Sequence, residues 1–137
     1  MTFLTDANIL SEPTKPEPDA RVQQWLRRYE PELVVDPIIL GEVRFGILKL
    51  PQGNKRQKLE HWFDDVVMGI VCLPWDAAIA IRWAGLLSDL RRSGRAMPLK
   101  DSMIAATALT HGLTVATRNG RDFQKAGLLV VNPFEEK

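Results

Sequence analysis

Short, strongly apolar segments alternate with longer stretches of helical periodicity along the whole chain. The apolar segments are rich in β-branched residues, and we expect strands at residues 1–5, 32–36, 70–74, 113–117 and 128–132. A helix between two such strands carries the chain back to the edge where the previous strand started, which favours parallel pairing. The sequence therefore predicts an α/β fold, an α/β/α sandwich around a central parallel sheet of four to five short strands.

Cap residues and turns indicate where the helices begin and end. Asp19 and Asp76 stand directly before apolar residues at helical spacing, Pro37 suits a first helical turn, and Gly112 suits a C-terminal cap. The proline-rich residues 13–18 are expected to form a loop. These signals predict a helical turn after the first strand and helices over residues 19–29, 37–50, 55–67, 76–90 and 98–112.

Composition limits the class of protein. The chain has 137 residues, of which 45% are hydrophobic, so we expect a single domain over residues 1–137 with a substantial core. The formal net charge of +1 gives no broad basic field of the kind that coats nucleic acid. The single Cys72 excludes an intrachain disulfide. No apolar run has the length of a membrane span and no signal-peptide pattern is visible, so a cytoplasmic protein is expected.

Acidic residues interrupt apolar sequence at widely separated points. Asp6 ends the first expected strand, Glu42 lies in DPIILGEVRFGIL, and Asp101 opens DSMIAATAL. An ionised carboxylate in apolar surroundings is costly unless it is paired or bound to a metal. Sites in parallel sheets form beyond the carboxyl ends of the strands, where these acids can converge. Because converging carboxylates repel one another, we expect a hard divalent cation, Mg²⁺ or Mn²⁺, among them.

Each of these acids also has a structural interpretation. Asp6 can cap a helical turn, and Asp101 can complement the positive end of a helix dipole. Glu42 can be a solvated residue paired with Arg44 or Lys49. The sequence alone leaves both interpretations open.

Zinc chemistry and covalent catalysis are poorly supported by residue spacing. His61 and His111 are not spaced as zinc ligands, and no serine stands in a nucleophile motif with a histidine. Gly41 and Gly46 do not form a phosphate-cradling loop.

The acidic residues belong to segments whose order resembles a known family. The segments FLTDANILSE, DPIILGEVRFGI, KDSMIAATALTHGLTVATRN and RDF together span nearly the whole chain. They resemble the PIN-domain ribonucleases, specifically the VapC-type toxin branch that includes FitB-like proteins. The matching positions are Asp6 and Asn8 in an Asp-x-Asn signature, Glu42 in a Glu-bearing helix, Asp101 in an Asp-x-x-Ile-Ala-Ala helix, and Thr117, Arg118 and Asn119 in a strand–turn segment. The resemblance implies a Rossmann-like PIN domain.

One position departs from the family pattern. Many relatives have a fourth acid directly after the Thr-Arg pair, where this chain has Asn119. An amide oxygen can ligate a cation but adds no negative charge. Either Asp122 supplies that charge or the site works with three acids, and the number of metal ions stays open.

The residues support metal-assisted hydrolysis of a phosphodiester bond. We expect Asp6 and Asp101 to be the most direct metal ligands, and Glu42 to bind the metal through a water or to act as a base. Asp122 is a further catalytic candidate. The supporting residues are expected to be Asn8, which would fix Asp6, together with Thr117 and Asn119.

The resemblance also implies the partners. It implies an RNA substrate, a homodimer, and a cognate antitoxin whose segment fills a groove and blocks the acidic site. The antitoxin would also bind operator DNA for the hetero-oligomer. Candidate contacts to the RNA backbone are Arg91, Arg92, Arg95 and Arg118, each with a solvated basic face as the equally weighted alternative.

The leading hypothesis is therefore a Mg²⁺-dependent endoribonuclease toxin. The alternative is a catalytically degenerate PIN-like module that binds nucleic acid or a protein partner, and Asn119 is its best support. A phosphatase or a DNA nuclease on a related scaffold is a third option.

Overall fold

The computed structural model describes residues 1–135 and has a parallel sheet at its centre. The sheet has five strands in the order β3-β2-β1-β4-β5. The strands are β1 (Phe3–Thr5), β2 (Leu33–Val35), β3 (Val71–Cys72), β4 (Thr114–Ala116) and β5 (Val130–Val131). The predicted fold class and all the predicted strands are confirmed. The final two residues of the domain predicted over 1–137 lie outside the described residues.

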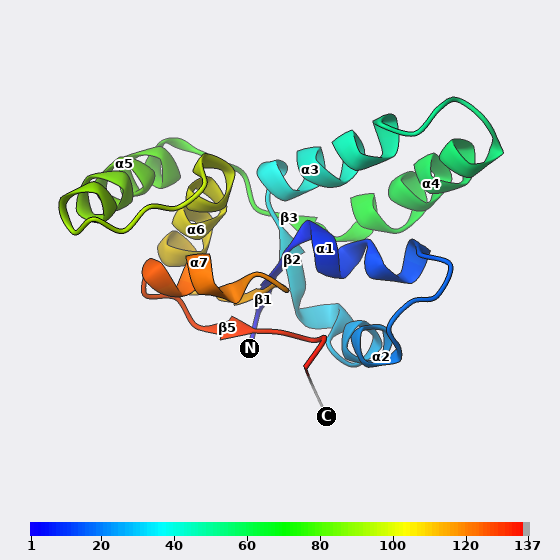
Figure 1. Cartoon of the computed structure of the whole chain (residues 1–137), viewed down its shortest axis with the longest axis horizontal. Helices are drawn as coiled ribbons and strands as arrows, with labels where there is room; N and C mark the ends of the chain where they lie inside the picture. The colour runs from blue at the N-terminus through cyan, green and yellow to red at the C-terminus, as the bar shows by residue number, and fades with distance from the viewer. Residues whose placement is uncertain (136–137) are drawn as a thin grey trace.

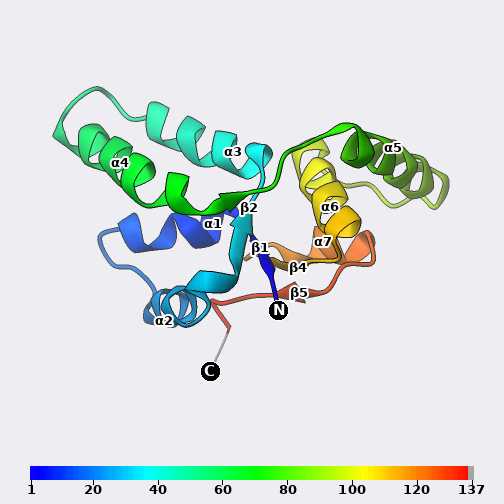
Figure 2. The same cartoon turned by 180° about the vertical axis from the view of Figure 1, so that it is seen from behind.

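The central strand β1 lies between β2 and β4 (Figure 2). Leu4 is in register with Val34 on one side and Val115 on the other. Both β1 and β2 are buried along their whole length, which is why they appear as uninterrupted apolar runs rather than alternating ones.

Helices follow the strands in the predicted order. They are α1 (Ala7–Leu10), α2 (Ala20–Arg28), α3 (Pro37–Leu48), α4 (Asn54–Asp65), α5 (Ala77–Arg92), α6 (Leu99–His111) and α7 (Gly120–Lys125). Short 3₁₀ turns lie at Glu12–Thr14, Glu30–Glu32 and Val67–Gly69. The first of these turns falls partly in the segment predicted as loop, because Pro13 suits a first-turn position.

The predicted helix boundaries have clear local causes. The carboxylates of Asp19 and Asp76 accept hydrogen bonds from backbone N–H groups of the helices they precede, as expected for N-caps. Asp36, which the sequence analysis did not single out, does the same for α3, whose first residue is Pro37. Gly112 ends α6 in the left-handed conformation with φ 64°.

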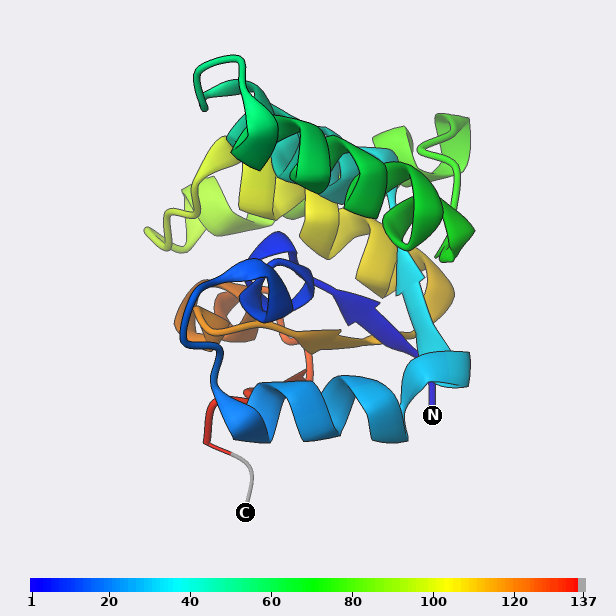
Figure 3. The ribbon, with the colours of Figure 1, turned by 90° about the vertical axis from the view of Figure 1, so that its right-hand side faces the viewer.

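The helices cover both faces of the sheet. Figure 3 shows α2 below the strands and α3, α4 and α6 above them. In Figure 1, α3 and α4 lie on one flank, while α5, α6 and α7 lie on the other. A close approach fixes α7 against the sheet edge, since a Cβ at Gly120 would lie 2.7 Å from Val130 Cγ1. The site described below lies between the two flanks.

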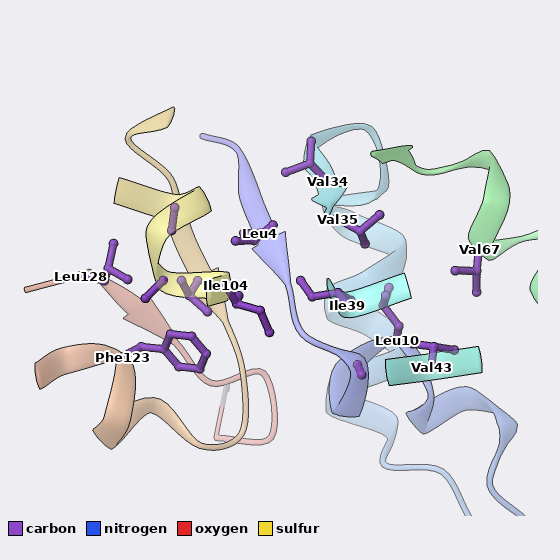
Figure 4. Packing of buried hydrophobic residues seen from close by; sticks show 14 of the residues in the cluster. Leu4, Leu10, Val34, Val35, Ile39, Val43, Val67, Ile104, Phe123 and Leu128 are labelled. Atoms are coloured by element: carbon purple, nitrogen blue, oxygen red, sulfur yellow. The ribbon is translucent and has the colours of Figure 1, made fainter. Parts of the chain in front are cut away.

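Two apolar cores follow from this layering. In the larger core, Leu4 lies between Ile104 and Phe123 on one side and Ile39 on the other (Figure 4). The smaller core lies on the opposite face of the sheet and consists of Phe3, Ile9, Val22, Trp25, Leu33, Ala116 and Phe134. Alternate residues of β1 therefore anchor opposite layers, which holds the end of this strand rigidly.

The helices within residues 1–135 are all too short or too polar to span a membrane.

Candidate active site

The candidate site lies at the carboxyl ends of the neighbouring strands β1 and β4. Asp6 directly follows β1 and Thr117 directly follows β4, and both are buried. The Asp6 backbone N–H donates to the Ala116 carbonyl at 2.9 Å, so strand pairing continues into the site. The sheet therefore places the side chains of Asp6 and Thr117 together, although they are far apart in the sequence.

The Asp6 carboxylate is held by neighbours on both strands. Its Oδ2 accepts from the Thr117 hydroxyl at 2.7 Å and from Asn8 Nδ2 at 3.4 Å. Its Oδ1 accepts from the Ala7 backbone N–H at 2.8 Å, which makes Asp6 the N-cap of α1. The cap interpretation is correct, and it does not exclude a ligand role for the same carboxylate.

The predicted supporting residues form a hydrogen-bond network behind Asp6. Asn8 Oδ1 accepts from the Arg118 backbone N–H at 3.2 Å, and the Asn119 N–H donates to the Thr117 hydroxyl at 3.1 Å. Asn8, Thr117 and Asn119 thus set the position of the Asp6 carboxylate through the turn after β4. Whether the Asn119 amide ligates a metal stays a prediction.

Asp101 lies in the first turn of α6, which two tryptophans fix against α5. Trp83 Nε1 donates to Ser102 Oγ at 3.0 Å, and Trp75 Nε1 donates to the Met103 carbonyl at 3.1 Å. The two indole rings also pack edge to face with centroids 6.0 Å apart. Asp101 therefore enters the site from a firmly seated helix end.

Glu42 enters from α3, which contacts both α1 and α6. Its Oε2 accepts from Lys100 Nζ at 2.7 Å, while its Oε1 is buried and has no hydrogen-bond partner among the described residues. The structural alternative of pairing with Arg44 or Lys49 is wrong, because Arg44 pairs with Glu60 and the Lys49 ammonium lies over the Phe45 ring.

Asp122 lies in α7 at the edge of the site. Its Oδ1 pairs with Lys125 Nζ at 3.1 Å, and its charge acts on Asp101. A negative charge is thus present near the position where Asn119 replaces the acid found in many relatives. Asp122 is brought to the site, and its catalytic role stays a prediction.

Burial and mutual repulsion perturb the acids at the centre of the site. Burial raises the pKa of Asp101 to about 6, and the charge of Asp6 adds to that rise. Burial likewise raises the pKa of Asp6, opposed by the Thr117 hydrogen bond and reinforced by the charge of Glu42. The ion pairs of residues 1–135 involve Glu42 and Asp122 but neither Asp6 nor Asp101. The two central carboxylates therefore have no ion-pair partner within the described residues, although the charge of Lys100 opposes the rise in the pKa of both.

The donor set fits a hard, hydrated cation. All its charged groups are carboxylates, and the buried Glu42 Oε1 has an open acceptor position. In residues 1–135, no group of three or more His, Cys, Asp or Glu side chains lies close enough together to hold a metal ion, so a cation here would be bound by fewer side chains and by water. Mg²⁺ keeps several waters and needs few direct protein ligands, so Asp6 and Asp101, with Glu42 alongside, are compatible with it.

The predicted RNA-binding arginines fall into two places. Arg118 lies beside the site, with its guanidinium 4.2 Å from the centroid of the Phe134 ring. The other three lie at the end of α5 and in the loop after it, where Arg92 pairs with Asp89 and Arg95 donates to the Lys125 carbonyl at 2.8 Å. Arg91 and Arg95 border a hollow of about 350 Å³ at the end of α5.

A groove of about 470 Å³ adjoins the acidic site. Its lining includes the polar residues Asn8, Glu42 and Lys100 and the apolar residues Phe45 and Trp62. Phe45 is 62% exposed, so part of the apolar lining is open to a partner or a ligand. The groove thus connects the carboxylates to an apolar surface between α1, α3 and α4.

The sequence analysis missed Lys100. A cation in the first turn of a helix is unfavourable with respect to the helix dipole, so a lysine directly before Asp101 was a detectable anomaly. It also missed the buried pair of Asp36 and Thr107, whose hydroxyl donates to Asp36 Oδ2 at 2.7 Å. No local signal indicates that bond, because the two residues meet only through tertiary packing.

Comparison with known proteins places this geometry in a family. The PIN domain model matches residues 3–129, which is most of the chain. The chain belongs to the PIN-domain family. The resemblance noted in the sequence is therefore confirmed, and the carboxylate cluster lies within the matched part of this PIN domain.

Relatives with similar sequences cover nearly all of the PIN domain chain. The VapC ribonuclease Y4jK of Sinorhizobium fredii is 35% identical, with 97% of this chain and 98% of the relative aligned. The toxin FitB of Neisseria gonorrhoeae is 34% identical, with 98% and 99% aligned. The structure of FitAB bound to an IR36 DNA fragment matches with a TM-score of 0.92 at 31% identity, covering 99% of this chain and 98% of that one.

Proposed function

We propose that this PIN domain is a Mg²⁺-dependent endoribonuclease that acts as the toxin of a toxin–antitoxin pair. The observation that carries the proposal is the convergence of Asp6, Glu42 and Asp101 at the carboxyl edge of the sheet. The names of the relatives support it, since they include a VapC ribonuclease and a toxin at about one-third identity over nearly the full length.

Each acidic residue has a different proposed role in phosphodiester hydrolysis, which follows from its position in the site. When bound, a divalent cation would neutralise phosphate charge and lower the pKa of the attacking water. Asp6, oriented by Thr117 and Asn8, and Asp101, oriented by the seated end of α6, would hold that cation. The free Oε1 of Glu42 is placed to accept a proton or hydrogen bond from a water.

An assay of RNA cleavage tests this assignment. The purified chain is incubated with structured RNA in Mg²⁺, with EDTA as the metal-free control and with a DNA and a small phosphoester as competing substrates. We expect the chain to cleave RNA but neither DNA nor the small phosphoester. This cleavage should be lost in EDTA and in the Asp101→Asn variant. Cleavage that persists in both Asp6→Asn and Asp101→Asn would reject this site, and cleavage of DNA instead would favour the nuclease alternative.

The groove beside the carboxylates is the proposed docking place for a cognate antitoxin. Its apolar lining suits an amphipathic segment, and the Glu42 carboxylate in that lining suits an Arg or Lys from the same segment. Phe45→Asp should weaken antitoxin binding while leaving free RNA cleavage intact. Ile81→Asp on α5 is the matched control, because it changes an exposed apolar residue outside the groove.

The same proposal includes a homodimer and operator binding through the antitoxin. Light scattering gives the mass of the isolated chain, and an electrophoretic shift of operator DNA compares the chain alone with the complex. A shift by the complex only is expected. A shift by the isolated chain would place DNA binding on the PIN domain itself.

The competing proposal is a degenerate PIN-like binding module. Asn119 favours it, because an amide stands where many relatives have an acid. Calorimetry with Mg²⁺ and Mn²⁺ separates the two proposals: absence of binding at millimolar metal would favour the module, and binding that Asp101→Asn removes would favour the nuclease.

A further inference from the structure

We propose that Lys100 is a built-in counter-ion that holds Glu42 in the metal-free protein and must release it when a divalent cation binds. The inference rests on the proposed metal-dependent function and adds a residue to it. Lys100 is then a positioning residue that competes with the cation for Glu42.

The first observation is the geometry of the ion pair. Lys100 Nζ lies 2.7 Å from Glu42 Oε2 and joins the first turn of α6 to the middle of α3. This is a short, charge-assisted bond. It engages one oxygen of Glu42 and leaves the buried Oε1 without a partner in the described chain. Glu42 is thus restrained by the lysine but not fully satisfied by it.

The second observation is the placement of the lysine. An ammonium near a helix N-terminus opposes the helix dipole, so this position is intrinsically unfavourable for a lysine. Its ammonium instead donates to Glu42 Oε2 at 2.7 Å, and Lys100 directly precedes Asp101 in the chain. The acids of the site, rather than the helix, therefore stabilise the cation at this point.

The third observation is that the bond is suited to exchange. The Lys100 side chain is 50% exposed and that of Glu42 is 29% exposed, so water screens the pair. Pairs of this kind contribute little net stability. A divalent cation carries twice the charge and can interact with Asp6 and Asp101 as well. It can therefore displace the ammonium into the adjoining groove, which Lys100 lines.

Metal affinity is the direct test. Mg²⁺ and Mn²⁺ are titrated by calorimetry into the wild-type chain, Lys100→Met, and the matched control Lys49→Met, which removes a lysine from the same groove without removing a partner of Glu42. Loss of the competing cation should tighten binding by roughly two- to fivefold, the range expected for a screened pair. Lys49→Met should bind as the wild type does.

A melting experiment without metal tests the same bond independently. In EDTA at low salt, the melting shifts of Glu42→Gln and Lys100→Met should fail to add in the double variant, and this coupling should vanish in concentrated salt. Additive shifts at low salt would overturn the counter-ion role.

The outcomes separate this inference from the proposed function. Metal binding by the wild type that Lys100→Met leaves unchanged or weakens would overturn the inference alone. Absence of metal binding in all variants would overturn the metal-dependent function, and the competition with it.

Discussion

Two buried aspartates follow neighbouring strands in almost the same way. Asp6 follows β1 and Asp36 follows β2, and each caps the next helix through a backbone N–H at 2.8 or 2.9 Å. Each also accepts a 2.7 Å hydrogen bond from a threonine hydroxyl, Thr117 for Asp6 and Thr107 for Asp36. Locally, the two residues are nearly interchangeable.

Their surroundings differ. Asp36 is 0% exposed and its threonine partner lies in α6, whereas Asp6 is 5% exposed and lies near Asp101 and Asn8. Burial raises the pKa of both carboxyls, and the charge of Glu42 adds to both. Asp6 in addition raises the pKa of Asp101 and accepts a hydrogen bond from Asn8. An aspartate that caps a helix and accepts from a threonine can therefore be either a structural residue or a site residue. The side chains around it decide which of these two roles it has.

The largest expected effect is on RNA cleavage, when the charge of each aspartate is removed in turn. Only the loss of the Asp6 charge should reduce cleavage, although the two aspartates have similar local hydrogen bonds. Asp6→Asn keeps much of the hydrogen-bonding shape but loses the charge that would hold a cation. Cleavage of RNA should fall by more than the roughly 10- to 100-fold typical of losing an outer-shell partner of a metal site. Asp36→Asn should keep cleavage close to the wild-type rate. Initial rates at equal folded concentration measure both, and similar losses in the two variants would contradict the comparison.

For stability, the order of the two aspartates should be reversed: truncation of Asp36 to alanine should cost more unfolding free energy than truncation of Asp6. Asp36→Ala removes a cap and leaves the buried Thr107 hydroxyl without its acceptor, which should cost about 2–4 kcal/mol of unfolding free energy. Asp6→Ala loses similar bonds but also relieves repulsion with Asp101, in addition to the repulsion with Glu42 that both aspartates share, so its cost should be smaller. Urea denaturation in EDTA measures both. A larger loss for Asp6→Ala would mean that repulsion at the site is negligible.

Removal of the hydroxyl from each threonine partner tests the same difference between Asp6 and Asp36, with a smaller expected effect. Thr117→Val removes the hydroxyl that orients Asp6 and should lower cleavage about tenfold. Thr107→Val should cost about 1 kcal/mol of stability and leave cleavage unchanged. Rates and denaturation curves are measured on the same preparations. Equal cleavage by the two variants would show that Thr117 does not position the site.

The smallest effect concerns pH and Asp101. Its pKa is raised to about 6 in the folded chain, so between about pH 4 and 6 the folded state binds more protons at this residue than the unfolded state. Its contribution to stability therefore grows as pH falls through that window and is lost as pH rises past about 6. Asp101→Asn should flatten this part of the pH profile of melting in EDTA. An unchanged slope would show that Asp101 is not perturbed.

Much of the fold could be predicted from local patterns. The five strands were identified because each is a short apolar run between turn signals, and Asp19, Asp76 and Gly112 marked helix ends by local hydrogen bonding and backbone conformation. Finer features could not be identified in this way. The break between α4 and the Val67–Gly69 turn is one of them, because it depends on the burial of Val67 in the core.

The site could be predicted only in part. The acids stood out because each interrupts apolar sequence, and the structure places Asp6, Asp122 and Glu42 close enough to Asp101 for their charges to raise its pKa. Pairing of Glu42 with Arg44 or Lys49 was the structural alternative for this residue, and the structure instead pairs it with Lys100, which lies 58 residues away. A short stretch of sequence contains only local partners, whereas the tertiary fold selected a distant one.

The sequence by itself determined the alternation of strands and helices, the caps, and the identity of the acids, because these depend on side-chain chemistry and short-range periodicity. Only the tertiary structure decided which of two similarly capped aspartates lies near Asp101, and that a lysine stands beside Glu42. The physical reason is that burial and charge interactions depend on distances between segments, which the order of residues in the chain does not specify.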